Sequence, residues 1–117
     1  MLVLRVNTVE RKRSTDFVGV DGGFNLVIEP FFYSLPCQPV PVRVADPATA
    51  FADERLDTVT IAGNINEALD VWAEGIALPP LAEGDLLAFL NAGGYGSAMS
   101  SNHCMRGQFH ERLLLHP

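Results

Sequence analysis

The stretch that decides the fold runs from Leu78 to Phe109 and reads LPPLAEGDLLAFLNAGGYGSAMSSNHCMRGQF. Two prolines open it, and the turn residues Glu83-Gly84-Asp85 lead into an unbroken apolar run from Leu86 to Leu90. This run is too short for a helix of usual length and is bounded by turn residues, so it predicts a fully buried strand.

A glycine-rich loop, Asn91-Ala92-Gly93-Gly94-Tyr95-Gly96, follows this strand. Glycines allow a sharp turn or a close approach of the backbone to a ligand, while Tyr95 displays a phenol. One interpretation is a binding site centred on Tyr95. The other is that Gly93, Gly94 and Gly96 only shape a turn, because no helix-opening GxGxxG or P-loop pattern is present.

Length and composition indicate one globular domain, which we expect to span residues 1–117. The 117 residues are 48% hydrophobic and 19% charged, which is typical of a chain with a packed core. The net charge of −6 argues against a nucleic-acid partner, which requires a basic face. The basic cluster Arg11-Lys12-Arg13 is best interpreted as a solvated hairpin tip.

The sequence predicts no membrane partner and a cytoplasmic location. No apolar stretch approaches membrane-spanning length, and Arg5 and Asn7 follow the first apolar residues too soon for a signal peptide. Without a secretion signal, the two cysteines, Cys37 and Cys104, are expected to be free thiols in a reducing compartment.

The remaining segments favour a mainly all-β fold, a small Greek-key-like β barrel with short helical turns. Prolines between Pro36 and Pro47 allow only an edge strand or extended loop there. Phe24–Phe32 is apolar but ambiguous, and Asn66–Trp72 is predicted to be a short helical turn or an irregular crossing. The predicted strands, besides Leu86–Leu90, are Leu2–Val9 and Phe17–Val20 as a hairpin, Leu56–Ala62, and Gln108–Leu115 as a closing strand.

Independent catalysis by this chain is not expected. Its single lysine, Lys12, lies in the charged turn, where no pocket would lower its pKa or hold a cofactor. His103, Cys104, His110 and His116 do not form the paired spacing of a structural zinc site. No serine or cysteine lies in a recognisable nucleophile motif.

Four phrases in order resemble the C-terminal β domain of the pyridoxal-phosphate-dependent diaminopimelate, ornithine and arginine decarboxylases. The similarity covers nearly the whole chain, from about Leu2 to Leu115, and the pair Ser101-Asn102 follows the last of the four phrases. They are Asp21-Gly22-Gly23-Phe24-Asn25; Gly63-Asn64-Ile65-Asn66-Glu67-Ala68-Leu69-Asp70; Leu78-Pro79 with Glu83-Gly84-Asp85; and Ala92-Gly93-Gly94-Tyr95-Gly96.

The resemblance implies a β barrel that works with a (β/α)8 barrel domain and supplies groups across a dimer interface. The large barrel would bind pyridoxal phosphate, and the isolated chain would bind none. By this analogy Tyr95 contacts the cofactor phosphate or the substrate, while Tyr33 and Glu67 contact the substrate. Asp70 matches the last acid of the family's cysteine-acid motif. Glu67 and Asp70 are also spaced i, i+3, so both could simply face solvent.

Four positions depart from the family pattern. Asn66 stands where the family has a cysteine that helps to return a proton, and an amide cannot act as a thiol acid. Glu29 stands where diaminopimelate enzymes have an arginine, and it would repel a substrate carboxylate. His103-Cys104 replaces a tyrosine-asparagine pair.

Two hypotheses of function therefore stand. The first is the C-terminal domain of an amino-acid decarboxylase that is inactive without its barrel domain. The alternative is a diverged binding or dimerisation module without enzyme activity, which Asn66 and Glu29 favour. In either case we expect self-association, because a domain that packs on a larger barrel exposes an apolar face when it is alone.

Overall fold

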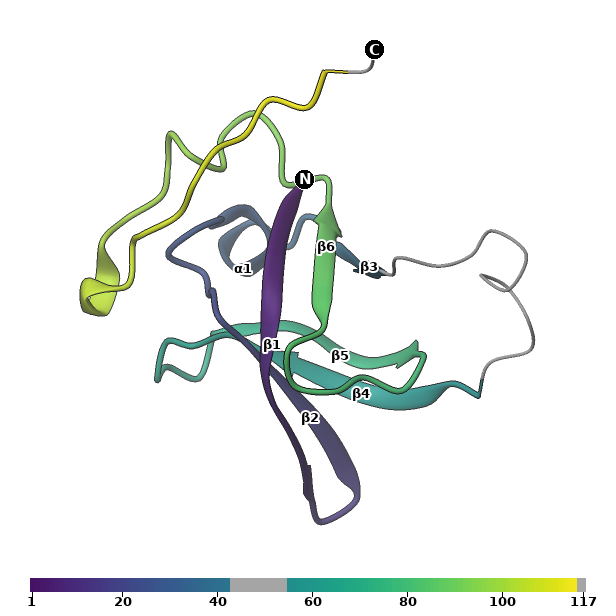
Figure 1. Cartoon of the computed structure of the whole chain (residues 1–117). Coiled ribbons are helices and arrows are strands. Elements are labelled where there is room, and N and C mark those ends of the chain that lie inside the picture. The colour runs from purple at the N-terminus through teal and green to yellow at the C-terminus, as the bar shows by residue number, and fades with distance from the viewer. Residues whose placement is uncertain (43–54, 116–117) are drawn as a thin grey trace.

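The computed structural model describes residues 1–42 and 55–115. Its strands are β1 (Leu2–Lys12), β2 (Thr15–Val20), β3 (Gln38–Val42), β4 (Asp57–Ala62), β5 (Val71–Leu78) and β6 (Leu86–Leu90). Two short helical turns complete the fold, α1 (Glu29–Phe32) and the 3-10 turn η1 (His103–Met105). The prediction of a mainly β domain with short helical turns is confirmed (Figure 1).

The six strands form one sheet in the order β3-β6-β1-β2-β4-β5. Among the strands of the described residues, only the β2–β4 pair is parallel; its register sets Asp16 opposite Val59. The order is not sequential, because β6 is inserted between β3 and β1. The proline-containing strand β3 lies at the edge of the sheet, where a missing N–H costs no ladder bond. The part of the predicted segment beyond residue 42 lies outside the described residues.

Strand β1 gives the sheet its curvature because its two halves have different partners. Residues Leu2 to Arg5 pair with β6, whereas Val6 to Lys12 pair with β2. The register shifts between Val6 and Thr8, and such a bulge bends a strand and increases its twist. The two halves of the sheet therefore cross and curl towards a nearly closed barrel (Figure 1).

The core lies inside this curl and includes the strand that the sequence marks most clearly. In β6, Leu87, Ala88 and Phe89 are buried, whereas Leu86 is half-buried and Leu90 is exposed; the strand is confirmed, and its burial holds for the three central residues. Trp72 packs against Phe89 at a ring-centroid distance of 4.5 Å and against Phe31 at 4.8 Å. Its indole N–H donates to the carbonyl of Gly22 at 2.9 Å, which satisfies the one polar atom of the ring.

The predicted closing strand Gln108–Leu115 is wrong. None of these residues belongs to a strand, and Leu113, Leu114 and Leu115 are 78–82% exposed. Among the described residues, no backbone–backbone hydrogen bond involves this segment. An apolar pattern predicts a strand only if an edge lies within reach to pair with it, and here the segment runs outside the sheet (Figure 1).

The sequence reading also missed strand β5. Residues 66–70 form an irregular turn, which is one of the two structures predicted for Asn66–Trp72. Val71 and Trp72 already belong to β5. Gly75 interrupts the apolar pattern and adopts φ +64°, next to a register shift in the pairing with β4. A bulge adds a residue to one strand, so the alternation of apolar and polar residues is interrupted and the sequence pattern does not predict the strand. The ambiguous segment Phe24–Phe32 proves to be a buried turn followed by α1.

Candidate functional site

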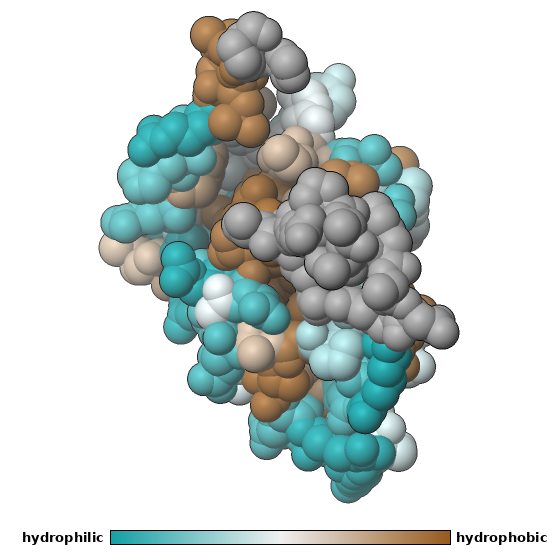
Figure 2. Space-filling model, turned by 45° about the vertical axis from the view of Figure 1, so that its right-hand side comes forward, coloured by the Kyte–Doolittle hydropathy of each residue, from teal (hydrophilic) through white to brown (hydrophobic). Residues whose placement is uncertain are grey.

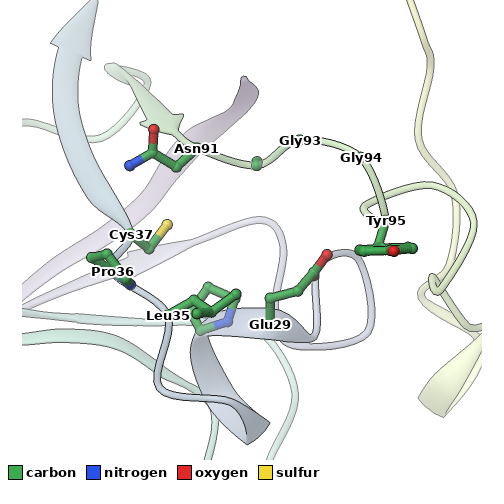
Figure 3. A pocket seen from close by; sticks show the side chains of 10 residues that line it. Glu29, Leu35, Pro36, Cys37, Asn91, Gly93, Gly94 and Tyr95 are labelled. Atoms are coloured by element: carbon green, nitrogen blue, oxygen red, sulfur yellow. The ribbon is translucent and has the colours of Figure 1, made fainter.

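A pocket of about 310 Å³ opens between the start of α1, the segment 35–37 and the glycine loop 91–95 (Figure 3). The chain forms it because β6 ends at Leu90 and the loop turns at once over α1. Asn91 adopts the left-handed conformation, φ 65°, which asparagine tolerates better than most residues. The sharp turn therefore depends on Asn91 and not on the glycines that follow it.

The glycines of this loop leave open space. A methyl group added at Gly94 would meet nothing within 4 Å, and one at Gly93 would meet only the carbonyl of Asn91 at 3.9 Å. Neither glycine has a positive φ. The loop is nevertheless held in place, since the amide of Gly96 donates to the carbonyl of Gly93 at 3.1 Å. The room above its backbone suits the close approach of a ligand.

Glu29 and Tyr95 are the predicted site residues that this pocket brings together. The Glu29 side chain extends from α1 towards the Tyr95 ring (Figure 3). Its Oε2 atom is buried and has no hydrogen-bond partner among the described residues. A buried carboxylate oxygen without a partner is costly. Tyr95 is 66% exposed, so its phenol is available to a molecule outside the chain.

Cys37 lines the same pocket. Both cysteines are free thiols, as the sequence predicted. Burial raises the pKa of Cys37 to about 11, because desolvation disfavours the thiolate. At neutral pH this raised pKa favours the protonated thiol over the nucleophilic thiolate.

A second cluster forms where the 63–70 loop meets the C-terminal segment. The Nε2 atom of His103 lies 2.5 Å from Oε1 of Glu67. The imidazole also packs against the ring of Phe24, with 5.1 Å between ring centroids. The side chains of Glu67 and His103 are 41% and 40% exposed, so the pair lies at the surface.

Asp70 lies beneath this pair and is only 3% exposed. Its Oδ1 accepts from the Phe24 amide at 2.8 Å, and its Oδ2 accepts from the Ile65 amide at 2.7 Å. Burial raises the pKa of this carboxyl, the two amide bonds lower it, and the Glu67 carboxylate raises it, with a net rise.

Two glycines explain how Asp70 reaches the backbone of both loops. A Cβ added at Gly23 or at Gly63 would lie within about 2.5 Å of the Asp70 carboxylate. Only glycine leaves the space for that carboxylate at these two positions. Asp70 therefore joins the loop that carries Phe24 to the loop that carries Glu67.

The C-terminal segment is fixed over the same loops by Asn25. The Ser101 amide donates to the Asn25 carbonyl at 2.7 Å. The Asn25 side-chain amide donates to the Arg106 carbonyl at 2.9 Å, and Asn25 itself is 2% exposed. His103 thus reaches Glu67 on a segment that is anchored on both sides.

Sequence reasoning placed five residues at a site, and the structure separates them into groups. Glu29 and Tyr95 share the pocket, while Glu67 lies above Asp70 in the second cluster. Tyr33 is 61% exposed and does not line the pocket. His103 received no role from the sequence, because its contact with Glu67 spans 36 residues. The one available signal was its departure from the family's tyrosine.

Other classes of site receive no support within residues 1–42 and 55–115. No group of three or more histidine, cysteine, aspartate or glutamate side chains there could hold a metal ion. No helix in this part of the chain is long and apolar enough to span a membrane. Lys12 is exposed at the tip of the β1–β2 hairpin, where its Nζ lies 3.1 Å from a Glu10 carboxylate oxygen.

Known proteins resemble this chain in both sequence and structure. Residues 1–93 match the family model of the pyridoxal-dependent decarboxylase C-terminal sheet domain. A diaminopimelate decarboxylase of Archaeoglobus fulgidus is 39% identical over 114 residues, and one of Methanothermobacter thermautotrophicus is 37% identical over 105. These matches cover 97% and 90% of this chain, but 26% and 23% of the two relatives.

Solved structures agree with the sequence matches. The crystal structure of AQ1208 from Aquifex aeolicus matches with a TM-score of 0.76 at 31% identity, over 88% of this chain and 24% of that one. Diaminopimelate decarboxylase from Helicobacter pylori, complexed with L-lysine, matches with a TM-score of 0.74 at 25% identity, over 89% and 24%. The chain spans about a quarter of the length of these relatives. With its fold and its ordered motifs, this chain therefore belongs to the family of pyridoxal-dependent decarboxylase C-terminal sheet domains.

Proposed function

We propose that this chain serves as the C-terminal domain of a pyridoxal-phosphate-dependent amino-acid decarboxylase. It supplies substrate- and cofactor-facing groups to a (β/α)8 barrel domain, across a dimer interface, and is not catalytic alone. Its substrate carries a cationic group at the end distant from the reacting carbon. Membership of the family supports the class of enzyme, and the Glu29 pocket supports the class of substrate.

The unpartnered carboxylate oxygen of Glu29 is the observation that carries the substrate class. An oxygen that is buried without a partner gains most from a donor that arrives with the ligand. Glu29 lines a pocket whose other polar side chains are the Cys37 thiol, the Asn91 amide and the Tyr95 phenol, and its buried Oε2 has none of them as a hydrogen-bond partner. An ammonium or guanidinium group neutralises the carboxylate there, whereas a second carboxylate is repelled. Lysine, ornithine and arginine fit this requirement, and diaminopimelate fits it poorly.

Pyridoxal phosphate, when bound, withdraws the electron pair that the departing carboxyl group leaves behind. The lysine that holds it comes from the barrel domain, because Lys12 is 63% exposed and paired with Glu10. This chain offers the exposed Tyr95 phenol instead, which can donate a hydrogen bond to the cofactor phosphate or to the substrate.

The remaining predicted residues lie outside this pocket, and we assign them the roles that the family resemblance implies. Tyr33 contacts the substrate from its exposed position after α1. Glu67 faces the distant end of the substrate on the 63–70 loop. Asp70 contributes through the loops that its carboxylate joins. Asn66 offers an amide donor and acceptor, so any proton returned to the product comes from another group.

A chimaera tests the proposal. This chain replaces the matching quarter of the Archaeoglobus fulgidus diaminopimelate decarboxylase, to which it is 39% identical over 114 residues. We expect the chimaera to decarboxylate lysine or ornithine in preference to diaminopimelate. In the chimaera, Glu29→Arg should move the ratio of kcat/KM values towards diaminopimelate by about tenfold or more, since reversing a close charge is worth several kcal/mol in a partly desolvated pocket.

Two controls make the outcome interpretable. The unaltered relative shows the native preference, and the absorbance of bound cofactor shows that each chimaera is assembled. If the assembled chimaera and its Glu29→Arg variant have the same ratio of kcat/KM values, Glu29 does not face the substrate and the substrate class is wrong. An assembled chimaera that decarboxylates no amino acid contradicts the enzyme role itself.

A second candidate is the dimerisation module without enzyme activity. The observation that favours it is the apolar surface near the C-terminal end, where Leu113, Leu114 and Leu115 are 78–82% exposed. Apolar surface is visible in the upper part of Figure 2. Exposed apolar groups of this kind are usually covered by another chain. The barrel domain of the first proposal would cover them equally well.

A further inference from the structure

The direction of the hydrogen bond between Glu67 and His103 follows from the chemistry of the two side chains. A carboxylate only accepts hydrogen bonds, so the imidazole must donate from the Nε2 that lies 2.5 Å from Glu67 Oε1. Both the imidazolium and the neutral tautomer protonated at Nε2 can do so. Within residues 1–42 and 55–115, His103 is the side chain that bonds the Glu67 carboxylate, and it does so at Oε1 alone.

The position of His103 is determined by more than this hydrogen bond. The ring of Phe24 packs against the imidazole of His103, with 5.1 Å between the ring centroids. The backbone on both sides is held by Asn25, through the Ser101 amide and the Arg106 carbonyl. The Gly107 amide also donates to the side-chain oxygen of Asn102 at 3.1 Å. A side chain held on such a support loses little further entropy when it binds Glu67.

We propose that His103 is a positioning residue that makes Glu67 selective for an ammonium group over a guanidinium group. This inference rests on the proposed function, in which Glu67 faces the distant end of the substrate. A guanidinium binds a carboxylate best through a fork that uses both oxygens. His103 already donates to Oε1, so among the described residues Oε2 is the Glu67 oxygen without a donor, and a single oxygen of this kind suits the point charge of an ammonium better than a two-oxygen fork. Lysine or ornithine is then preferred to arginine.

Two substitutions separate the donor of His103 from its ring. His103→Phe retains the packing on Phe24 but cannot donate. His103→Gln loses the ring but keeps an N–H for Glu67. His110→Phe, which alters a histidine that does not contact Glu67, serves as the matched control. A purely structural role of the ring would leave His103→Phe unaffected and damage His103→Gln.

The first measurement uses the 117-residue chain alone. Carbon-13 NMR records the Glu67 carboxyl resonance in the native chain and in each variant at constant pH. We expect His103→Phe to move this resonance and His103→Gln to restore most of the native shift, with no change in His110→Phe. An unchanged resonance in His103→Phe shows that the pair does not form in solution and overturns the inference, whatever the chain does in an enzyme.

The second measurement uses the chimaera described above, with lysine, ornithine and arginine in competition. We expect the native chimaera to prefer an ammonium substrate, and His103→Phe to shift the kcat/KM ratio towards arginine by about tenfold, the effect of one charge-assisted hydrogen bond at a partly exposed site. His103→Gln should keep the native ratio. If His103→Phe leaves the ratio unchanged in an active chimaera, His103 does not set specificity. If the native chimaera acts on no amino acid, the proposed function fails, and the NMR comparison alone then decides whether His103 positions Glu67.

Discussion

Replacing Asp70 should destabilise the fold in two graded steps. Asp70→Ala leaves the Phe24 and Ile65 amides, now bonded to the carboxylate at 2.8 and 2.7 Å, as buried donors without partners. Each unsatisfied donor costs about 2 kcal/mol, and relief from burying an ionised group offsets about 1 kcal/mol of the sum. We expect a loss of about 3 kcal/mol in the free energy of unfolding at pH 7. Asp70→Asn keeps one acceptor oxygen and should lose roughly half as much.

Urea unfolding followed by tryptophan fluorescence measures this loss. Trp72 is the only tryptophan, is 5% exposed and lies two residues from Asp70. Glu67→Ala is the control, since its side chain is 41% exposed and its removal should change stability little. If Asp70→Ala unfolds within 1 kcal/mol of the native chain, the two amides find other partners, and Asp70 does not hold the loops together.

The same series gives a pH dependence with a definite sign. Burial raises the pKa of Asp70 above its usual value of 3.8, so the folded chain binds this proton more tightly than the unfolded chain. The contribution of Asp70 to stability is then fully present below the usual pKa and falls as the pH rises through the raised pKa. The stability advantage of the native chain over Asp70→Asn should therefore shrink across this acidic window. An advantage that grows with pH would contradict the sign.

Two further predictions concern the isolated chain. After incubation with pyridoxal phosphate and borohydride, mass spectrometry should find no stoichiometric adduct on Lys12, because this exposed side chain has Glu10 as a partner and no pocket; a full adduct would mean that the chain has a cofactor site of its own. The chain should self-associate with rising concentration in sedimentation experiments, and replacing Leu113, Leu114 and Leu115 with serine should reduce the association, since these side chains are 78–82% exposed. A native chain that stays monomeric over the whole concentration range would show that these exposed leucines do not drive association.

The sequence by itself determined the β class, the buried strand and the family. Leu86–Leu90 could be read locally because an apolar run between turn residues has one common structural meaning. The prolines of residues 36–41 placed β3 at an edge, since each proline removes a ladder donor. The family motifs could also be identified from the sequence, because they are short and occur in a fixed order along the chain. All of these signals depend on neighbours in sequence.

Only the tertiary structure decided how the polar residues are paired. Asp70 reads as one of two acids spaced i, i+3, yet its environment depends on Gly23 and Gly63, whose missing side chains leave room for its carboxylate. His103 meets Glu67 across 36 residues. Glu29, whose Oε2 is buried without a partner, shares its pocket with the 91–95 loop, which follows a distant strand. The apolar pattern at Gln108–Leu115 predicted a strand that does not form, because a strand requires an edge that no local pattern can supply. Hydrogen bonds and strand pairing join groups that are distant along the chain, and a single sequence records each residue's preference but not the partner that meets it.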